Sequence, residues 1–368
     1  MEQETISTKT NEKNADKKTF PAKLKEFFVK HKKLTITLSS VIGAILIFIL
    51  LCLTTYIPKT GDTDYTSSVA LSNPNICEKT QVSAHRAGRF LAPENTMAAF
   101  RECFDNMDDY AVDVLEFDLH LTKDGDLILL HDDTLDRTSD CKDVYGEKKV
   151  EPINKTVSEL KQYNMGYHFE LNGKYPYRDM TPEQLDAVGA RITTLREVLD
   201  YLKTQEEEKG LTLHYIIEIK NGKEAGYKAA DILAATLDEY GLTERTIVGT
   251  FNGEVSKYLD EKHPEITRSA GIAEVLGFYF GSIFGVPLNN VKYKVLQIPY
   301  KDFGINFGKK SLIDYAHKYG IAVQFWTINK AEDVEHLTMI GADAIMSDDP
   351  KMAYDVITAF NVIGKYYK

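Results

Sequence analysis

Acidic and basic residues stand two positions apart inside otherwise apolar runs of the chain. Glu116 and Asp118 lie in VLEFDLHL, and Glu218 and Lys220 lie in YIIEIK. Side chains two residues apart on a strand point to the same face. Two carboxylates side by side among apolar residues are costly unless a cation lies between them, and oxygen ligands suit Mg²⁺ or Ca²⁺. We therefore expect Glu116, Asp118 and Glu218 to hold a divalent cation.

Both pairs also have a plainer interpretation. Glu116 and Asp118 could lie on the solvated outer face of an edge strand, although the apolar residues around them argue against this. Glu218 and Lys220 could form a buried ion pair with a structural role only. In the functional interpretation, Lys220 neutralises a phosphate oxygen.

Two histidines could supply acid–base chemistry next to these carboxylates. His85 and Arg86 end the run VSAHR, and both can reach one site only if the strand stops there, which Gly88 favours. His131 ends LILLH, and pairing with the preceding strand would bring it close to Asp118. Trp326, the only tryptophan, ends a further apolar run, where a role in the core is the simpler interpretation of that residue alone.

Taken together, these side chains are the groups that metal-assisted phosphodiester cleavage requires. Three carboxylates would bind the cation, two cationic side chains would contact phosphate, and two histidines would transfer protons. The attacking group could be water or a neighbouring hydroxyl of the substrate. The sequence contains no C-x-x-C zinc motif, no G-x-S-x-G nucleophile turn and no G-x-x-x-x-G-K phosphate loop.

These residues need a scaffold that brings strand ends together. Between residues 81 and 360, apolar runs alternate with amphipathic stretches. The predicted strands are VSAH, VLEFDLHL, DLILLH, YIIEIK, TIVGTF, TRSAGI, KVLQIP, AVQFWTI and DAIMS. The predicted helices cover 94–107, 194–209, 224–240, 309–319 and 330–340. This alternation predicts the α/β class and a TIM (β/α)₈ barrel, whose active site forms at the carboxyl ends of its strands.

The barrel should be distorted. Only KDGD connects VLEFDLHLT to LILLH, so these two strands should form an antiparallel hairpin, because parallel neighbours need a crossover of a dozen residues or more. Nine candidate strands also exceed the eight of a regular barrel. Residues 132–194 are too long and polar for an ordinary loop, and we predict an insertion that caps the mouth of the barrel.

The N-terminal part of the chain has a different character. Residues 34–57 carry no charge and are long enough to cross a bilayer as a helix, which we predict to be an uncleaved single-pass anchor. Residues 1–33 carry nine lysines against five acids, so this tail should be cytoplasmic and the catalytic domain extracellular, at the cell membrane. A cleaved signal peptide and a lipoprotein at Cys52 fit less well. We expect residues 58–79 to be a linker and 80–362 to be the barrel.

Charge and cysteine content exclude other classes of protein. The net charge of the 368 residues is −11, and 50 acidic against 35 basic residues follow residue 33, so nucleic acid is not an expected partner. Four cysteines are too few for a disulfide-scaffolded domain. Three of them, Cys77, Cys103 and Cys141, would lie outside the membrane, which leaves at least one without a partner in the same chain.

Several longer motifs resemble the glycerophosphodiester phosphodiesterase family. They are HRAGRFLAPENTMAAF, LEFDLHLTKDGDLILLHDDTLDRT, TLREVLDYL, IIEIK and FWTIN followed after eleven residues by GADAIMSDDP. The resemblance implies a TIM barrel that hydrolyses glycerophosphodiesters to glycerol 3-phosphate and an alcohol with a divalent cation. By motif position it implies metal ligands at Glu116, Asp118 and Glu218, an acid–base pair at His85 and His131, and substrate-side residues at Arg86, Lys220, Trp326, Glu94 and Asn95.

Two alternatives to this function remain open. A lysophospholipase D that acts on a lysophospholipid in the membrane would suit the anchor, and the apolar stretch 277–286 could then face lipid, although a buried short helix is the simpler interpretation. A catalytically inactive barrel that serves as a scaffold would have lost at least one of the matched carboxylates or histidines, and the sequence retains them all.

Overall fold

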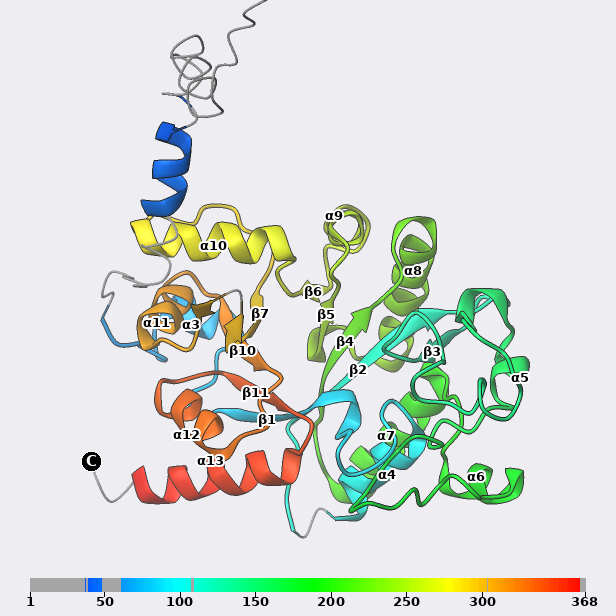
Figure 1. Ribbon diagram of the computed structural model, residues 1–368. Helices are drawn as coiled ribbons and strands as arrows, with labels where there is room; N and C mark the ends of the chain where they lie inside the picture. The colour runs from blue at the N-terminus through cyan, green and yellow to red at the C-terminus, as the bar shows by residue number, and fades with distance from the viewer. Residues whose placement is uncertain (1–36, 38, 48–60, 107–108, 303, 365–368) are drawn as a thin grey trace, which may run out of the picture. The chain divides into compact units, whose positions relative to one another are not determined.

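The described strands form a parallel α/β barrel. In this computed structural model the described residues are 37, 39–47, 61–106, 109–302 and 304–364, and the chain divides into two units, 1–56 and 57–368. In the second unit, eight described strands run parallel in the order β6-β5-β4-β2-β1-β11-β10-β7, and a parallel bridge between Ser269 and Val295 connects the two ends of this order. The described residues thus bear out the predicted distorted TIM barrel (Figure 1).

The strands match the predicted apolar runs. They are β1 (Gln81–Ala84), β2 (Val114–Leu121), β3 (Leu127–Leu129), β4 (His214–Ile219), β5 (Thr246–Gly249), β6 (Thr267–Arg268), β7 (Val295–Pro299), β10 (Ala322–Trp326) and β11 (Ala344–Ser347). A separate small hairpin joins β8 (Lys301–Asp302) and β9 (Ile305–Asn306). As the sequence predicts, β3 pairs antiparallel with β2, because the Gly125 turn is too short for a crossover.

Helices surround the barrel (Figure 1). The five predicted helices are α4 (Met97–Asp105), α7 (Leu195–Lys209), α8 (Lys223–Tyr240), α11 (Lys310–Lys318) and α12 (Ala331–Met339). In α7 a capping box at Thr194 and Glu197 starts the helix, and the predicted apolar face is buried. Helices that we did not predict are α3 (Ser68–Leu71), α5 (Val157–Leu160), α6 (Pro182–Val188), α9 (Gly253–Lys262) and α13 (Pro350–Gly364). The stretch 277–286, for which a short helix was one of two interpretations, overlaps α10 (Ile272–Phe284).

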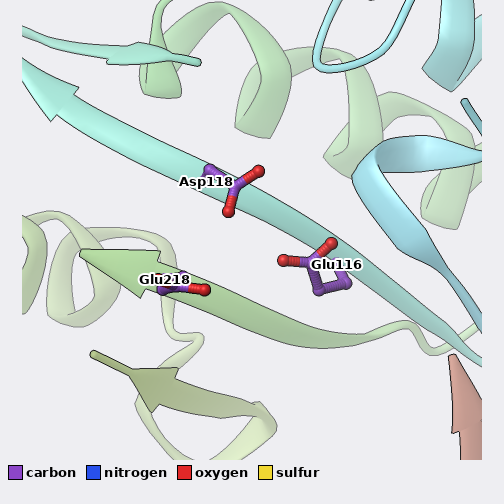
Figure 2. Close-up of side chains that lie close together, drawn as sticks. All are labelled: Glu116, Asp118 and Glu218. Carbon is purple, nitrogen blue, oxygen red and sulfur yellow. The ribbon is translucent and has the colours of Figure 1, made fainter. Parts of the chain in front are cut away.

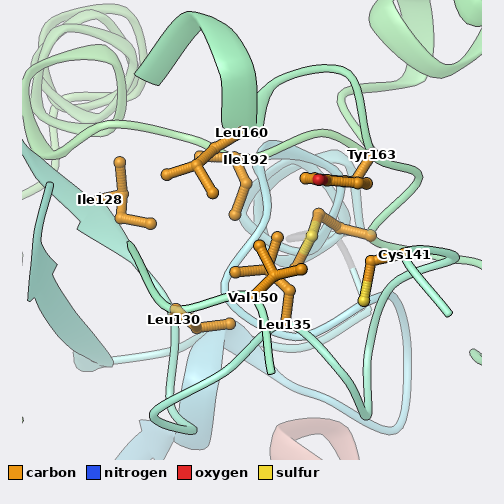
Figure 3. Close-up of a cluster of buried hydrophobic side chains, with 9 residues drawn as sticks. Ile128, Leu130, Leu135, Cys141, Val150, Leu160, Tyr163 and Ile192 are labelled. Atoms are coloured by element: carbon orange, nitrogen blue, oxygen red, sulfur yellow. The ribbon is translucent and has the colours of Figure 1, made fainter. Parts of the chain in front are cut away.

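The segment after the hairpin has a hydrophobic core of its own (Figure 3). Leu135, Cys141, Val150, Leu160 and Tyr163 are buried together against Ile128 and Leu130 of the hairpin. Such a satellite cluster holds a long, mostly irregular segment in one conformation. The predicted insertion therefore has a defined structure that rests on β3.

The predicted linker is bound to the barrel from residue 61 onward. The Asn73 amide donates to the carbonyl oxygens of Lys294 and Gly320 at 2.8 and 3.0 Å. The backbone N–H of Cys77 donates to Asp343 Oδ1 at 2.7 Å. These long-range hydrogen bonds attach the described part of the linker to the ends of β7, α11 and β11. Cys77, Cys103 and Cys141 are all free thiols, and the last two are buried.

The predicted cytoplasmic tail and most of the predicted transmembrane segment lie outside the described residues. Within 34–57, residues 37 and 39–47 are described, and they are helical. Among the described parts of the chain, we find no helix with the length and apolar character needed to span a bilayer.

Candidate active site

Three carboxylates meet where Glu116 and Asp118 on β2 face Glu218 near the carboxyl end of β4 (Figure 2). The parallel register pairs Asp118 with Glu218, and Glu116 lies two residues earlier on the same face of β2. One oxygen from each of the three side chains lies within 4.8 Å of the others. The register of β2 and β4 therefore assembles the predicted cluster, which the sequence spacing alone specified only for Glu116 and Asp118.

Burial makes the negative charges of this cluster energetically unfavourable. Loss of solvent, and then the negative charge of Asp118, raise the pKa of Glu116 well above its usual range. Burial likewise raises the pKa of Glu218, although the Lys220 ammonium opposes the change. Burial also disfavours the Asp118 anion, but Lys220, His131 and Arg86 outweigh that effect and hold the pKa of Asp118 below its usual range. The cluster as a whole favours added positive charge.

Two cationic side chains border the carboxylates. Lys220 Nζ lies 3.0 Å from Asp118 Oδ1 and 2.8 Å from Glu218 Oε1. Burial lowers the pKa of Lys220, and the two carboxylates outweigh this so that the net shift is upward. Arg86 Nε lies 3.8 Å from Asp118 Oδ2, while the backbone N–H of Arg86 donates to Glu116 Oε2 at 2.7 Å. Arg86 therefore contributes both a side-chain charge and a backbone hydrogen bond.

The end of β1 brings His85 and Arg86 to one site. The strand stops at Ala84, and Arg86, Ala87 and Gly88 all have positive φ, at 51°, 60° and 84°. Non-glycine residues adopt this region at a cost of about 1–3 kcal/mol, and such strain persists only where surrounding contacts enforce it. Here the hydrogen bond from Arg86 to Glu116 supplies one such contact. The predicted stop of the strand is confirmed.

His85 is oriented by a residue from the other end of the chain. Its Nδ1 lies 2.5 Å from Asp348 Oδ1, and its Nε2 lies 4.0 Å from Glu116 Oε2. The Asn329 amide donates to the other Asp348 oxygen at 2.7 Å. Burial opposes ionisation of Asp348, but the hydrogen bond from His85 outweighs it and lowers the pKa of that carboxyl. An ionised carboxylate only accepts hydrogen bonds, so the proton sits on Nδ1 and Nε2 is left for the cavity.

His131 has a similar arrangement with a different support. Its Nδ1 lies 2.7 Å from Asp132 Oδ1, and this hydrogen bond is the main reason why the pKa of Asp132 is lowered. Arg137 donates from Nε to Asp132 Oδ2 at 2.7 Å and from Nη2 to Asp132 Oδ1 at 3.1 Å. The same guanidinium also donates two hydrogen bonds to Glu94, at 2.7 and 2.9 Å. Arg137 thus connects Asp132, which holds His131, to Glu94 in the segment that follows His85.

Glu94 and Asn95 support the site from behind its wall. Arg86 Nη1 donates to Glu94 Oε1 at 2.9 Å. The Asn95 amide donates to Asp118 Oδ2 at 2.9 Å, and the backbone N–H of Asp118 donates back to Asn95 Oδ1 at 3.3 Å. Neither residue lines the central cavity, so the structure gives them contacts with Arg86 and Asp118 rather than a place in the substrate space.

The cavity in front of the carboxylates has a volume of about 270 Å³. Its walls contain His85, Arg86, Glu116, Asp118, His131, Glu218, Lys220 and Trp326, which are eight of the ten predicted site residues. Trp326 meets the exposed ring of Phe251 edge-on at 6.1 Å, and both rings border the space. Polar side chains and apolar rings therefore share one enclosure at the carboxyl ends of the strands, where TIM barrels place their active sites.

The donor set fits a hard divalent cation. It consists of carboxylate oxygens alone, which suit Mg²⁺ and Ca²⁺ better than softer metals. Next to Glu218 on β5 stands Gly249, where a Cβ would lie 3.3 Å from Gln297 Oε1 and 3.9 Å from Glu218 Cγ, so a larger residue would crowd this space. The raised pKa of Glu116 also favours a bound cation, because a cation at this position would offset the unfavourable negative charge.

Residues 85–352 match the profile of the Glycerophosphoryl diester phosphodiesterase family. This chain belongs to that family. The predicted family is thereby confirmed, and so is the prediction of an enzyme, since members of this phosphodiesterase family hydrolyse phosphodiester bonds. The matched range begins at His85 and includes all ten predicted site residues.

Relatives of this glycerophosphoryl diester phosphodiesterase domain cover most of the chain. A glycerophosphodiester phosphodiesterase of Caldanaerobacter subterraneus is 28% identical over 76% of this chain and 98% of its own length. A human lysophospholipase D, GDPD1, is 22% identical over 76% of this chain and 86% of its own. A phosphodiesterase of Oleispira antarctica, solved with the product sn-glycerol-3-phosphate, superposes with a TM-score of 0.57 at 21% identity, covering 79% of this chain and all of that one. The structural likeness shows the shared fold.

Sequence reasoning missed several residues of the phosphodiesterase site. Asp348, Asn329 and Arg137 support the two histidines, and Phe251 and Gln297 line the cavity. The positions of three of them could have revealed their role. Asp348 directly follows β11, Asn329 closely follows β10, and Phe251 closely follows β5. Other predicted site residues, such as His85 after β1, also stand just after a strand. Arg137 carries no such signal, since it lies in the irregular insertion.

Proposed function

We propose that this protein hydrolyses glycerophosphodiesters to glycerol 3-phosphate and an alcohol with the help of a divalent cation. The observation that carries the proposal is the meeting, in one cavity, of the carboxylate cluster with two imidazoles that are each held at Nδ1 by a carboxylate. The relatives named above include a glycerophosphodiester phosphodiesterase and a phosphodiesterase solved with sn-glycerol-3-phosphate, which supports the same substrate class.

The residues of this chain take distinct parts in the reaction. Arg86 and Lys220 line the cavity and attract the phosphate anion, which they orient next to the carboxylates. His85 and His131 present Nε2 for proton transfer, one as the base toward the attacking hydroxyl and the other as the acid toward the departing alkoxide. Each such transfer is typically worth about 10²- to 10⁴-fold in rate.

Glu116, Asp118 and Glu218 would hold the cation. When bound, a divalent ion supplies positive charge that polarises a phosphoryl oxygen and stabilises the charge that develops during displacement. The carboxylates keep this charge at the strand ends, and Asn95 fixes the orientation of Asp118 through its amide. The rings of Trp326 and Phe251 border the cavity on its apolar side.

The test is the release of glycerol 3-phosphate from a panel of glycerophosphodiesters by the full chain in detergent micelles. We expect activity with Mg²⁺ or Ca²⁺, loss with EDTA and recovery on adding the ion back. His85→Ala and His131→Ala should each lose at least about 10²-fold in kcat. His263→Ala is the control, because that imidazole pairs with Asp231 near the surface. Wild-type kcat in both site variants would refute the assigned roles.

A lysophospholipase D activity is a second candidate function. The exposed Phe251 ring and Trp326 give the cavity an apolar border that could accept the lipid part of a lysophospholipid. The human relative named above is a lysophospholipase D. A comparison of kcat/KM for glycerophosphocholine and for lysophosphatidylcholine decides between the two. A preference for the lysolipid that Phe251→Ala removes would favour the second candidate.

We also propose that residues 34–57 anchor the enzyme in the cell membrane, with residues 1–33 in the cytoplasm and the barrel outside. The support is the uncharged run with lysines before it. The described part of the run, 39–47, is helical and exposes apolar side chains such as Ile45 and Leu46. We expect the protein to resist extraction from membranes at alkaline pH. We also expect protease added to intact cells to digest the barrel. Release at alkaline pH would refute the anchor.

A further inference from the structure

Helix α10 exposes several apolar side chains. Ile272 and Phe284 are 56% and 61% exposed, and Leu276 lies between them at helical spacing. Ala273 and Gly277 are exposed as well, while Phe278, Tyr279 and Ile283 of the same helix are buried. We call the exposed side, with Ile272, Leu276 and Phe284, the α10 face. Sequence analysis had allowed a lipid-facing stretch or a buried helix here, and the structure has a helix that is half buried and half exposed.

The α10 face carries no unpaired acid. From residue 272 to 294 the charged residues are Glu274, Lys292 and Lys294. Glu274 accepts two hydrogen bonds from Arg268, at 2.7 and 2.8 Å. Lys292 and Lys294 are exposed in the segment that follows the helix. In a chain of net charge −11, a helix with exposed apolar side chains, followed in sequence by two exposed lysines, suits an anionic lipid surface.

The segment that leads to the proposed anchor is fixed next to this helix. Thr63 Oγ1 donates to Asp314 Oδ1 at 3.1 Å and lies 2.9 Å from His317 Nδ1, and Lys310 Nζ lies 2.8 Å from Asp62 Oδ1. All three partners belong to α11. The start of the barrel unit is therefore bound along α11 by its first described residues.

Helix α11 in turn packs on α10. The rings of Phe278 in α10 and Tyr315 in α11 meet edge-on at 5.7 Å, and the Tyr315 hydroxyl donates to the carbonyl oxygen of Val286. Only residues 58–61 separate Asp62 from the end of the uncharged run. The connection between the proposed anchor and the segment bound to α11 is therefore only a few residues long.

We propose that the α10 face lies in the interfacial layer of the membrane that holds the anchor. The proposal rests on the anchoring proposed above and adds a contact between the barrel itself and lipid. A short connection bound to α11 keeps the neighbouring α10 close to the bilayer, and its exposed apolar side chains insert where headgroups meet acyl chains. The barrel then has a fixed orientation on the membrane instead of turning freely on a tether.

The experiment uses the full chain in phosphatidylcholine–phosphatidylglycerol vesicles, with lipid brominated near the headgroup end of the acyl chains as a contact quencher. Trp326→Phe removes the only native indole. In that background Phe284→Trp and, separately, Ile272→Trp place an indole on the α10 face. Met339→Trp is the matched control, because Met339 on α12 is 59% exposed. Circular dichroism melts confirm that each variant is folded.

We expect the brominated lipid to quench about half or more of the emission from the two α10 indoles and little from the control. Equal, weak quenching in all three variants would overturn the proposal. An α10 indole that is shielded from aqueous iodide but insensitive to brominated lipid would also overturn it, because a second copy of the chain would then cover the face. Alkaline extraction of the same vesicles tests the anchor separately, so a protein that stays in the membrane with unquenched indoles refutes the α10 contact alone.

Discussion

His85 Nδ1 lies 2.5 Å from Asp348 Oδ1, and the two residues are separated by 263 positions in the chain. The contact exists because β1 and β11 are parallel neighbours, with Ala84 beside Ser347 at their carboxyl ends. A carboxylate at this place holds the imidazole ring in one orientation and in one tautomer, and it stabilises the positive charge that His85 acquires during proton transfer.

Asp348→Asn should therefore reduce kcat while leaving the fold intact. The amide is isosteric but can donate to Nδ1, which would move the ring proton to Nε2. We expect a loss of about 10²- to 10⁴-fold in kcat, a smaller change in KM and an altered pH–rate profile. Asp355→Asn, on the exposed surface of α13, is the control for a lost charge. An unchanged pH–rate profile in Asp348→Asn would argue against the orienting role.

Arg137 should matter through His131. Its guanidinium binds both Asp132 and Glu94, so its removal frees the carboxylate that holds His131. We expect Arg137→Ala to lower kcat by about tenfold, in line with the loss of one supporting group, and Arg137→Lys to restore part of it. Arg196→Ala is the matched control for Arg137→Ala, because Arg196 is similarly exposed and makes a bidentate pair with Glu239. Equal kinetics in the Arg137 and Arg196 variants would contradict the role.

Glu94 should make folding stability depend on acid pH. Burial disfavours its charge, but the hydrogen bond from Arg137 and the charge of Arg86 outweigh burial and lower the pKa of Glu94 from 4.5 to about 2. A carboxyl with a lowered pKa stabilises the folded state above its unfolded pKa, and this contribution is lost as pH falls through the folded pKa. The difference corresponds to about 3 kcal/mol at neutral pH.

The measurement is urea unfolding of wild type and Glu94→Gln between pH 7 and pH 2. The two free energies of unfolding should differ most at neutral pH and converge between about pH 4.5 and pH 2. Glu239→Gln, in an exposed pair, should show little difference at any pH. If the difference in free energy of unfolding between wild type and Glu94→Gln stays constant down to pH 2, the charge of Glu94 does not cause that difference.

Glu116 and Asp118 should respond in opposite ways to loss of charge when no cation is bound. The pKa of Glu116 is raised, so its ionised form destabilises the fold at neutral pH, and Glu116→Gln should increase Tm in EDTA. The pKa of Asp118 is lowered, so Asp118→Asn should decrease Tm. Added Mg²⁺ or Ca²⁺ should raise Tm of wild type by mass action and have much less effect on either variant. Thermal melts with and without the ion check all three expectations, and an ion-dependent rise that is equal in wild type and variants would place the cation elsewhere.

Local patterns in the sequence predicted a large part of this structure. The nine predicted apolar runs form strands, and the four-residue connection after β2 joins it to β3 in a hairpin. Both could be predicted because strand alternation and turn length are properties of neighbouring residues. The spacing of two placed Glu116 and Asp118 on one face for the same reason. The histidines at strand ends followed from the rule that barrels form their sites there.

Helix α10 shows where such local reasoning fails. Its residues are apolar on nearly every side, so periodicity could not separate a buried helix from a lipid-facing stretch. Part of it is buried because it packs on α11 in the folded protein. The segment from Asp62 to Cys77 was predicted as a linker, but the Thr63 side chain binds α11 and the backbone N–H of Cys77 binds Asp343.

The sequence by itself determined which chemistry this protein has available, namely three carboxylates, two histidines and two cations at strand ends. Only the tertiary structure decided their geometry. The register of β2 and β4 set Glu218 beside Asp118, closure of the barrel brought Asp348 to His85, and the folded insertion brought Arg137 to Glu94. These contacts join residues that are 43 to 263 positions apart. Partners at such distances are selected by packing of the whole barrel, which no pattern of neighbouring residues encodes.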